Sequence, residues 1–86
     1  MNDAEKIEEF DLVEIIAVPE EPKGIIDIGD IGIVLDKYDD ENFEVECGKP
    51  DGSYKWLTPL HVRYFKLISK DPYGIRKRTE SGDGQT

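Results

Sequence analysis

Few residues of this chain have types and spacing that could support catalysis. The single histidine, His61, lies in the segment Pro-Leu-His-Val, and a zinc site built on it would need Cys47 and carboxylates at a ligand spacing that is not present. A general base also needs a nucleophile, and no strained elbow or glycine-rich segment presents one. A lone histidine beside a turn is more often structural than catalytic. We therefore predict no catalytic residue and expect that the protein is not an enzyme.

Metal and nucleotide sites are disfavoured by the same reasoning. Carboxylates gather between residues 36 and 44, but they lack the alternating oxygen ligands, central glycine and terminal glutamate of a calcium-binding loop. A solvated hairpin tip is the favoured interpretation of this cluster. The glycines between residues 24 and 32 are not followed by Lys-Ser or Lys-Thr, as a phosphate-binding loop requires. We expect neither a metal nor a cofactor.

The single cysteine and the N-terminal residues indicate a cytoplasmic protein. Cys47 cannot form an internal disulfide, so the fold must rest on packing, as is usual in a reducing compartment. The first six residues are acidic and polar, unlike a secretory signal peptide. No apolar stretch is long enough to span a bilayer. We expect a cytoplasmic location and no membrane contact.

Charge is distributed unevenly along the 86 residues, whose formal net charge is −9. Residues 1–48 contain sixteen Asp and Glu against three Lys, whereas residues 49–86 contain four acids and eight Lys and Arg. An acidic face repels phosphate backbones and attracts basic protein surfaces. The alternative is that the acids only keep a small domain soluble. Both interpretations remain open at this point.

Short strands must position these residues. Residues 29–34, Gly-Asp-Ile-Gly-Ile-Val, join a turn to a β-branched strand, and a glycine within a strand marks a bend or the close approach of another chain. Residues 43–47 alternate strictly, which directs their apolar side chains, including Cys47, inward and Glu44 and Glu46 to water. The predicted strands are residues 10–18, 30–38, 43–47, 53–58 and 63–68, with one helical turn at residues 59–62.

The first predicted strand and the loop after it need separate comment. Residues 10–18 also carry apolar positions at helical spacing, but their density of Val and Ile and the lack of a capping residue favour a strand. The loop at residues 19–28 contains two prolines, and its isoleucines imply that part of it folds onto the core. We expect a flexible lead at residues 1–9, one domain at residues 10–69 and a disordered tail at residues 70–86.

Five short strands, with a long loop after the first and a helical turn before the last, follow the order of an SH3-like barrel. The chain combines an apolar first strand, a proline-glycine loop, Gly-Asp-x-Gly-x-Val, an acidic turn at residues 39–42 and Phe-Glu-Val-Glu at residues 43–46. In these features residues 10–68, about two thirds of the chain, resemble a family of small bacterial SH3-like domains of uncharacterised function. The Gly-x-Val step is also similar to the KOW motif of ribosomal and transcription-factor barrels, which are usually basic. The resemblance implies an all-β, five-stranded SH3-like barrel that binds a neighbouring protein, as antitoxin and immunity proteins do.

Aromatic residues are the best indication of a binding surface. Tyr38, Tyr54, Trp56 and Tyr64 fall on short predicted strands, and so small a barrel cannot enclose every ring. Parity places Tyr54 and Trp56 on one face. An exposed ring beside a charged turn is typical of a protein interface. Trp56 is either the centre of the core or part of the interface, and the tyrosines are better candidates for exposure.

The first functional hypothesis is a non-enzymatic protein-binding module that offers an acidic hairpin and nearby tyrosines to a basic partner protein, with inhibition of a toxin as one version. Carboxylates would steer the encounter, and the rings would supply buried contact. The partner's identity and the oligomeric state are left open. The candidate partner-binding residues are Tyr38, Asp39, Asp40, Glu41, Glu44, Glu46, Tyr54 and Tyr64.

The second hypothesis is a KOW-type barrel that associates with nucleic acid or the ribosome. It requires a basic or aromatic stripe, and the net charge of −9 disfavours it. The basic residues that could form such a stripe are Lys49, Lys55, Arg63, Lys66 and the cluster Arg76-Lys77-Arg78 in the tail.

Overall fold

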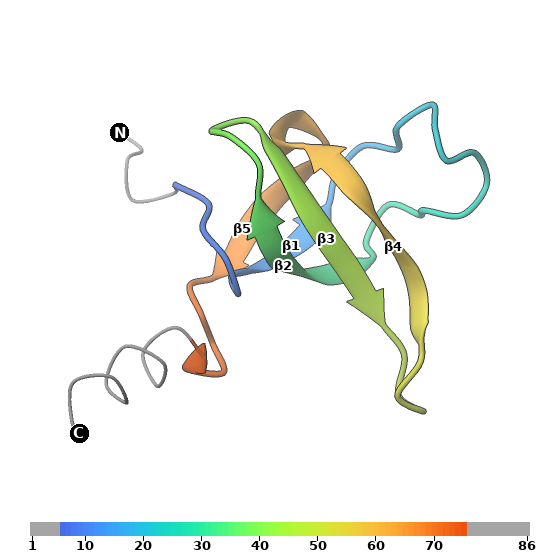
Figure 1. The fold of residues 1–86 in the computed structure, drawn as a ribbon. Coiled ribbons are helices and arrows are strands. Elements are labelled where there is room, and N and C mark those ends of the chain that lie inside the picture. Colours follow the sequence, from blue (N-terminus) through green and yellow to red (C-terminus); the bar gives the residue numbers. More distant parts are fainter. Residues whose placement is uncertain (1–5, 76–86) are drawn as a thin grey trace, which may run out of the picture.

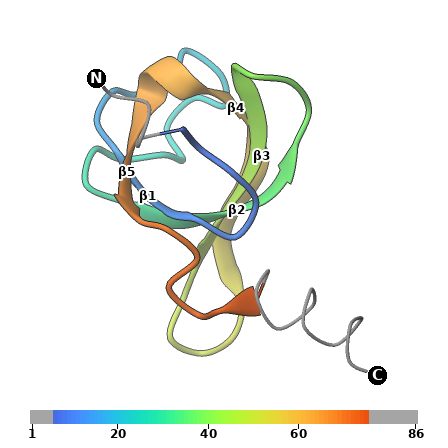
Figure 2. The ribbon, with the colours of Figure 1, turned by 90° about the vertical axis from the view of Figure 1, so that its left-hand side faces the viewer.

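Five strands form one antiparallel sheet in the computed structural model, which describes residues 6–75. The sheet order is β4-β3-β2-β1-β5, and the strands curl around a common core (Figures 1 and 2). Within residues 6–75 no strand pairing joins β4 to β5, so the sheet is open along these two edges. The expected all-β fold of five strands is confirmed, whereas closure into a barrel is not. The strands are β1 (Leu12–Ile15), β2 (Ile31–Lys37), β3 (Asn42–Gly48), β4 (Tyr54–His61) and β5 (Phe65–Ser69), with the 3₁₀ turn η2 (Val62–Tyr64) between the last two.

Alternation along the strands separates an inner face from an outer face. In β3 every second side chain is buried, from Phe43 to Cys47, while Glu44 and Glu46 point outward, as the sequence predicts. The rings of Phe43 and Phe65 meet edge to face, with centroids 5.9 Å apart. The sheet therefore has one apolar side that faces the core and one side that faces outward. The buried apolar residues are Ile7, Val13, Ile15, Ile26, Val34, Phe43, Val45, Cys47, Trp56, Leu60 and Phe65.

The first strand is extended rather than helical, but it is shorter than predicted. Phe10 has a positive φ of 73°, so the regular strand begins only after it. Beyond Ile15 the N–H groups of Ile16 and Ala17 both donate to the carbonyl oxygen of Tyr64, at 2.9 and 3.3 Å. These bonds divert the chain from the β1–β2 ladder, and the strand ends there.

At Gly32 the neighbouring strand β3 lies close to β2. A Cβ atom at this position would lie 2.7 Å from Val45 Cγ1 and 3.0 Å from the carbonyl oxygen of Glu46. Only glycine fits without a shift of the neighbouring strand, since real Cβ contacts do not reach such distances. The predicted close approach at this glycine is therefore confirmed.

The helical turn lies three residues later than predicted. β4 continues through Pro59, which pairs with Glu44 of β3 and lies on an edge strand, where a missing N–H is tolerated. The turn then forms at Val62–Tyr64, because the His61 side chain caps it by accepting a hydrogen bond from Arg63 N–H. No helix within residues 6–75 has the length and apolar character needed to cross a lipid bilayer.

Contacts at both ends of the domain extend beyond residues 10–69. Ile7 is buried in the core. The fully buried carboxylate of Asp11 accepts hydrogen bonds from Glu8 N–H at 2.8 Å, Asp71 N–H at 2.9 Å and Lys70 Nζ at 2.7 Å. The rest of the predicted flexible lead and disordered tail, residues 1–5 and 76–86, lies outside the described residues, as does the Arg76-Lys77-Arg78 cluster.

Candidate functional site

The turn between β2 and β3 is shaped by one of its own acids. Asp39 Oδ1 accepts hydrogen bonds from the N–H groups of Glu41 and Asn42, both at 2.8 Å, and from Asn42 Nδ2 at 3.1 Å. The Glu41 N–H and the Asn42 side chain favour the ionised form and lower the pKa of Asp39. Asp39 thus holds the turn in shape, while the neighbouring Asp40 and Glu41 project into solvent.

The turn is also tied to η2. The carbonyl oxygen of Glu41 accepts a hydrogen bond from Val62 N–H at 2.7 Å, and its carboxylate lies 3.5 Å from His61 Nε2. His61 Nδ1 accepts the N–H of Arg63 at 3.0 Å. The histidine therefore connects two surface segments.

Two acidic residues occupy opposite positions on β2 and β3. Asp36 lies directly opposite Glu44 in the strand register. Within residues 6–75 neither carboxylate has a Lys, Arg or His ion-pair partner. Like charges at directly opposite positions destabilise a sheet. Glu44 accepts a hydrogen bond from the hydroxyl of Tyr38, and this bond raises the pKa of Tyr38.

Glu46 lies two residues further along β3, among aliphatic side chains. The register places Leu12, Ile33, Glu46 and Leu57 side by side across β1, β2, β3 and β4. Leu57 is 39% exposed and Ile31, near this row on β2, is 42% exposed. The outer face therefore combines carboxylates with solvent-exposed aliphatic groups. Exposed aliphatic groups of this kind are typical of a surface that binds another molecule.

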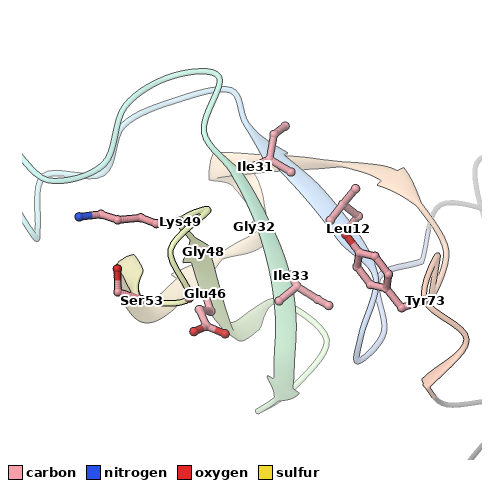
Figure 3. A pocket seen from close by; sticks show the side chains of 10 residues that line it. Leu12, Ile31, Gly32, Ile33, Glu46, Gly48, Lys49, Ser53 and Tyr73 are labelled. Carbon is pink, nitrogen blue, oxygen red and sulfur yellow. The ribbon is translucent and has the colours of Figure 1, made fainter.

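A shallow hollow of about 390 Å³ lies over the outer side of β2. Leu12 and Tyr73 line one side of it, and Glu46 and Ser53 line the other (Figure 3). The hollow adjoins the Asp36–Glu44 pair along β3, so the two features belong to one surface. We call this surface the outer acidic face. It consists of Asp36, Glu44, Glu46 and their aliphatic neighbours Leu12, Ile31, Ile33 and Leu57.

The predicted aromatic residues divide between core and surface. Trp56 is 3% exposed and belongs to the core, whereas Tyr54 is 53% exposed at the start of β4. The prediction that they share a face is wrong, because a bulge opposite Cys47 and Gly48 shifts the register between them. Tyr64 lies in η2, half-buried, with the Arg63 guanidinium carbon 5.7 Å from its ring centroid. Neither Tyr54 nor Tyr64 lies on the β2–β3 hairpin.

Asp30 has a structural role that sequence reasoning missed. Its carboxylate accepts hydrogen bonds from Trp56 Nε1 at 2.8 Å, Asp27 N–H at 2.9 Å and Lys55 Nζ at 3.0 Å. Burial alone would raise the pKa of Asp30, but these donors outweigh it and hold the pKa below its usual value. The Gly-Asp pair indicated a turn, and nothing in the spacing indicated a link to β4.

Within residues 6–75 the basic residues are dispersed rather than aligned. Lys55 Nζ is held by Asp27 at 2.8 Å as well as by Asp30, and the pair raises the pKa of Lys55. Lys66 of β5 lies 3.8 Å from Glu14 of β1. In the described part of the chain no three His, Cys, Asp or Glu side chains gather closely enough to hold a metal ion.

Comparisons with protein-family models, curated proteins and solved structures gave no match to this chain.

Proposed function

We propose that the protein is a non-enzymatic, cytoplasmic protein-binding module with an SH3-like fold, and that it binds a basic partner protein through the outer acidic face and the adjoining β2–β3 turn. The fold is supported by the strand order β4-β3-β2-β1-β5, the long β1–β2 loop and the 3₁₀ turn before β5. Inhibition of a toxin is one form of this function, and it rests on the resemblance to small bacterial SH3-like domains alone.

The observation that carries the proposal is the Asp36–Glu44 pair. Two carboxylates at opposite positions of a ladder cost stability, and no cation of residues 6–75 offsets that cost. Conflicts of this kind between local rules and the fold are expected where a surface is used for function. A lysine or arginine of a partner protein would relieve the repulsion and gain charge-assisted hydrogen bonds.

The surroundings of the pair favour a protein over a free ion. Exposed aliphatic groups such as Leu57 and Ile31 lie beside the carboxylates and supply apolar area for a partner to bury. Asp40 and Glu41 on the turn add negative charge at the edge of this surface, which would speed the encounter with a basic protein.

Affinity capture with charge-matched variants tests the proposal. The Asp36→Lys/Glu44→Lys variant reverses the pair, and Glu20→Lys/Glu21→Lys applies the same charge change to two exposed acids of the β1–β2 loop. We expect the wild type and the loop variant to recover the same basic protein from the native cell, and the face variant to lose it. Recovery of that protein by all three forms would contradict the proposal.

A further inference from the structure

The hollow on the outer acidic face has a size that suits one long side chain. Residues 31–33 of β2 are among those that line the hollow. Gly48 and Gly52 leave its hairpin side open, since no atom lies within 4 Å of where their Cβ atoms would stand. A volume of about 390 Å³ is at the lower end of the range for ligand pockets, about 300–1,000 Å³, which suits a side chain rather than a large cofactor.

Little of the β2 backbone beside the hollow is left for strand addition, since residues 31–33 pair with β1 and Ile33 also pairs with β3. β2 is paired on one side with β1 and on the other with β3. Because these main-chain groups are already paired, we expect an occupant to be recognised through its side chain rather than by extending the sheet.

Its two sides differ in chemistry. Leu12, Ile33 and the ring of Tyr73 make one side apolar, and Glu46 supplies a half-buried carboxylate on the other (Figure 3). Within residues 6–75 Glu46 has no ion-pair partner, and the nearest lining cation, Lys49, points away from it (Figure 3). The occupant must therefore carry a positive end on an apolar stem.

Arginine meets these requirements better than lysine. Its aliphatic stem can cover Leu12 and Ile33 while the guanidinium reaches the Glu46 carboxylate in a bidentate arrangement. The planar guanidinium also matches a carboxylate with two parallel hydrogen bonds, which the ammonium group of lysine cannot form.

We propose that the hollow binds an arginine side chain presented by a protein partner, with Glu46 as its counter-ion and Leu12 and Ile33 as the apolar surface for its stem. This inference rests on the proposed function, since it names the residue type that the outer acidic face recognises.

Three peptides test the arginine preference directly. The probe is acetyl-Gly-Leu-Arg-Leu-Gly-amide, and its matched forms carry citrulline, which is neutral and nearly isosteric, or lysine in the central position. Titration of the isotope-labelled full chain, followed by amide chemical shifts, is expected to move the signals of Ile33, Glu46 and Ser53. The citrulline peptide should bind about 3- to 10-fold more weakly and the lysine peptide several-fold more weakly.

Variants of the protein assign this preference to Glu46. Glu46→Gln should abolish the difference between the arginine and citrulline peptides. Glu14→Gln is the matched control, because Glu14 is a half-buried outer-face acid that faces Lys66 instead of the hollow, and it should retain the difference. Shifts confined to other surfaces, no detectable binding, or a difference that persists in Glu46→Gln would overturn the inference.

The peptide titration and the capture experiment distinguish failure of the arginine site from failure of the proposed function. If the peptides show no arginine preference but Asp36→Lys/Glu44→Lys still loses the basic partner, the hollow is not an arginine site and the proposed function stands. If reversal of the pair leaves partner capture unchanged, the proposed function fails, whatever the peptides show.

Discussion

Trp56 Nε1 donates a hydrogen bond of 2.8 Å to Asp30 Oδ2, which joins the residue before β2 to the edge strand β4. Lys55, the neighbour of Trp56, binds the same carboxylate. Asp30 therefore accepts hydrogen bonds from both the Trp56 indole and the Lys55 ammonium group. These bonds connect the end of the β1–β2 loop to β4 through side chains alone.

Loss of this indole donor should destabilise the fold. Trp56→Phe keeps an aromatic ring in the core but leaves Asp30 without one of its donors, at an expected cost of about 1–3 kcal/mol in the free energy of unfolding. Urea denaturation followed by far-UV circular dichroism measures it, since Trp56 is the only tryptophan and fluorescence is lost with it. If Trp56→Phe and Asp30→Asn show fully additive effects, the two side chains do not act together.

Asp30 should also contribute to the pH dependence of stability. Its folded-state pKa is lowered, so its contribution is complete above the unfolded-chain pKa of about 3.9 and is lost as the pH falls through the folded-state pKa. We expect the wild type to lose stability more steeply than Asp30→Asn between about pH 5 and pH 2. Denaturant midpoints over this range provide the measurement. If stability changed equally steeply with pH in both proteins, Asp30 would have the same pKa in the folded and unfolded states.

Gly32→Ala should cost about 1–3 kcal/mol, because the new Cβ would overlap Val45 Cγ1 and crowd the Glu46 carbonyl. Val45→Ala in the same chain removes one of these contacts and should recover part of that cost, so the double variant should be less destabilised than the sum of the single variants. Gly48→Ala is the control, since its Cβ would meet no atom within 4 Å. Equal losses for the two glycine variants would refute the close-approach explanation.

The alternation of residues 43–47 and the glycine at position 32 were sufficient to predict a curved all-β sheet, because both follow from local geometry. The sequence could not reveal the bulge that separates Tyr54 from Trp56, since a shift in strand register depends on the partner strand. Nor could it reveal the burial of Asp11 or the Asp30–Trp56 bond, whose partners lie about 60 and 26 positions away in the chain.

The candidate site was predictable only in part, for the same reason. Glu44 and Glu46 face outward as their alternation predicts, and the turn acids lie on the β2–β3 turn. The pairing of Asp36 with Glu44 and the hollow beside Glu46 depend on the β2–β3 register and on the position of Tyr73. Neither can be read from one strand alone.

The repulsion between Asp36 and Glu44 predicts a gain in stability when it is removed. Asp36→Asn retains the oxygen that accepts Lys37 N–H at 2.8 Å but loses the charge, so the free energy of unfolding should rise by about 0.2–1 kcal/mol at neutral pH. Asp40→Asn removes an acid that pairs with Lys37 at 3.5 Å and should bring no gain. Equal stability of the wild type and Asp36→Asn in low-salt urea denaturation would contradict the predicted repulsion.

Association kinetics with the captured basic partner measure whether the outer acidic face attracts that partner. The Asp36→Lys/Glu44→Lys variant keeps two like charges opposite each other and should fold as the wild type does, so stopped-flow mixing compares surfaces of opposite sign on one fold. At low salt we expect this variant to have an association rate constant at least about tenfold below the wild-type value, a difference that shrinks with added salt. We expect a much smaller effect in Glu20→Lys/Glu21→Lys. Equal rate constants for the two variants would show that the outer acidic face does not attract the partner.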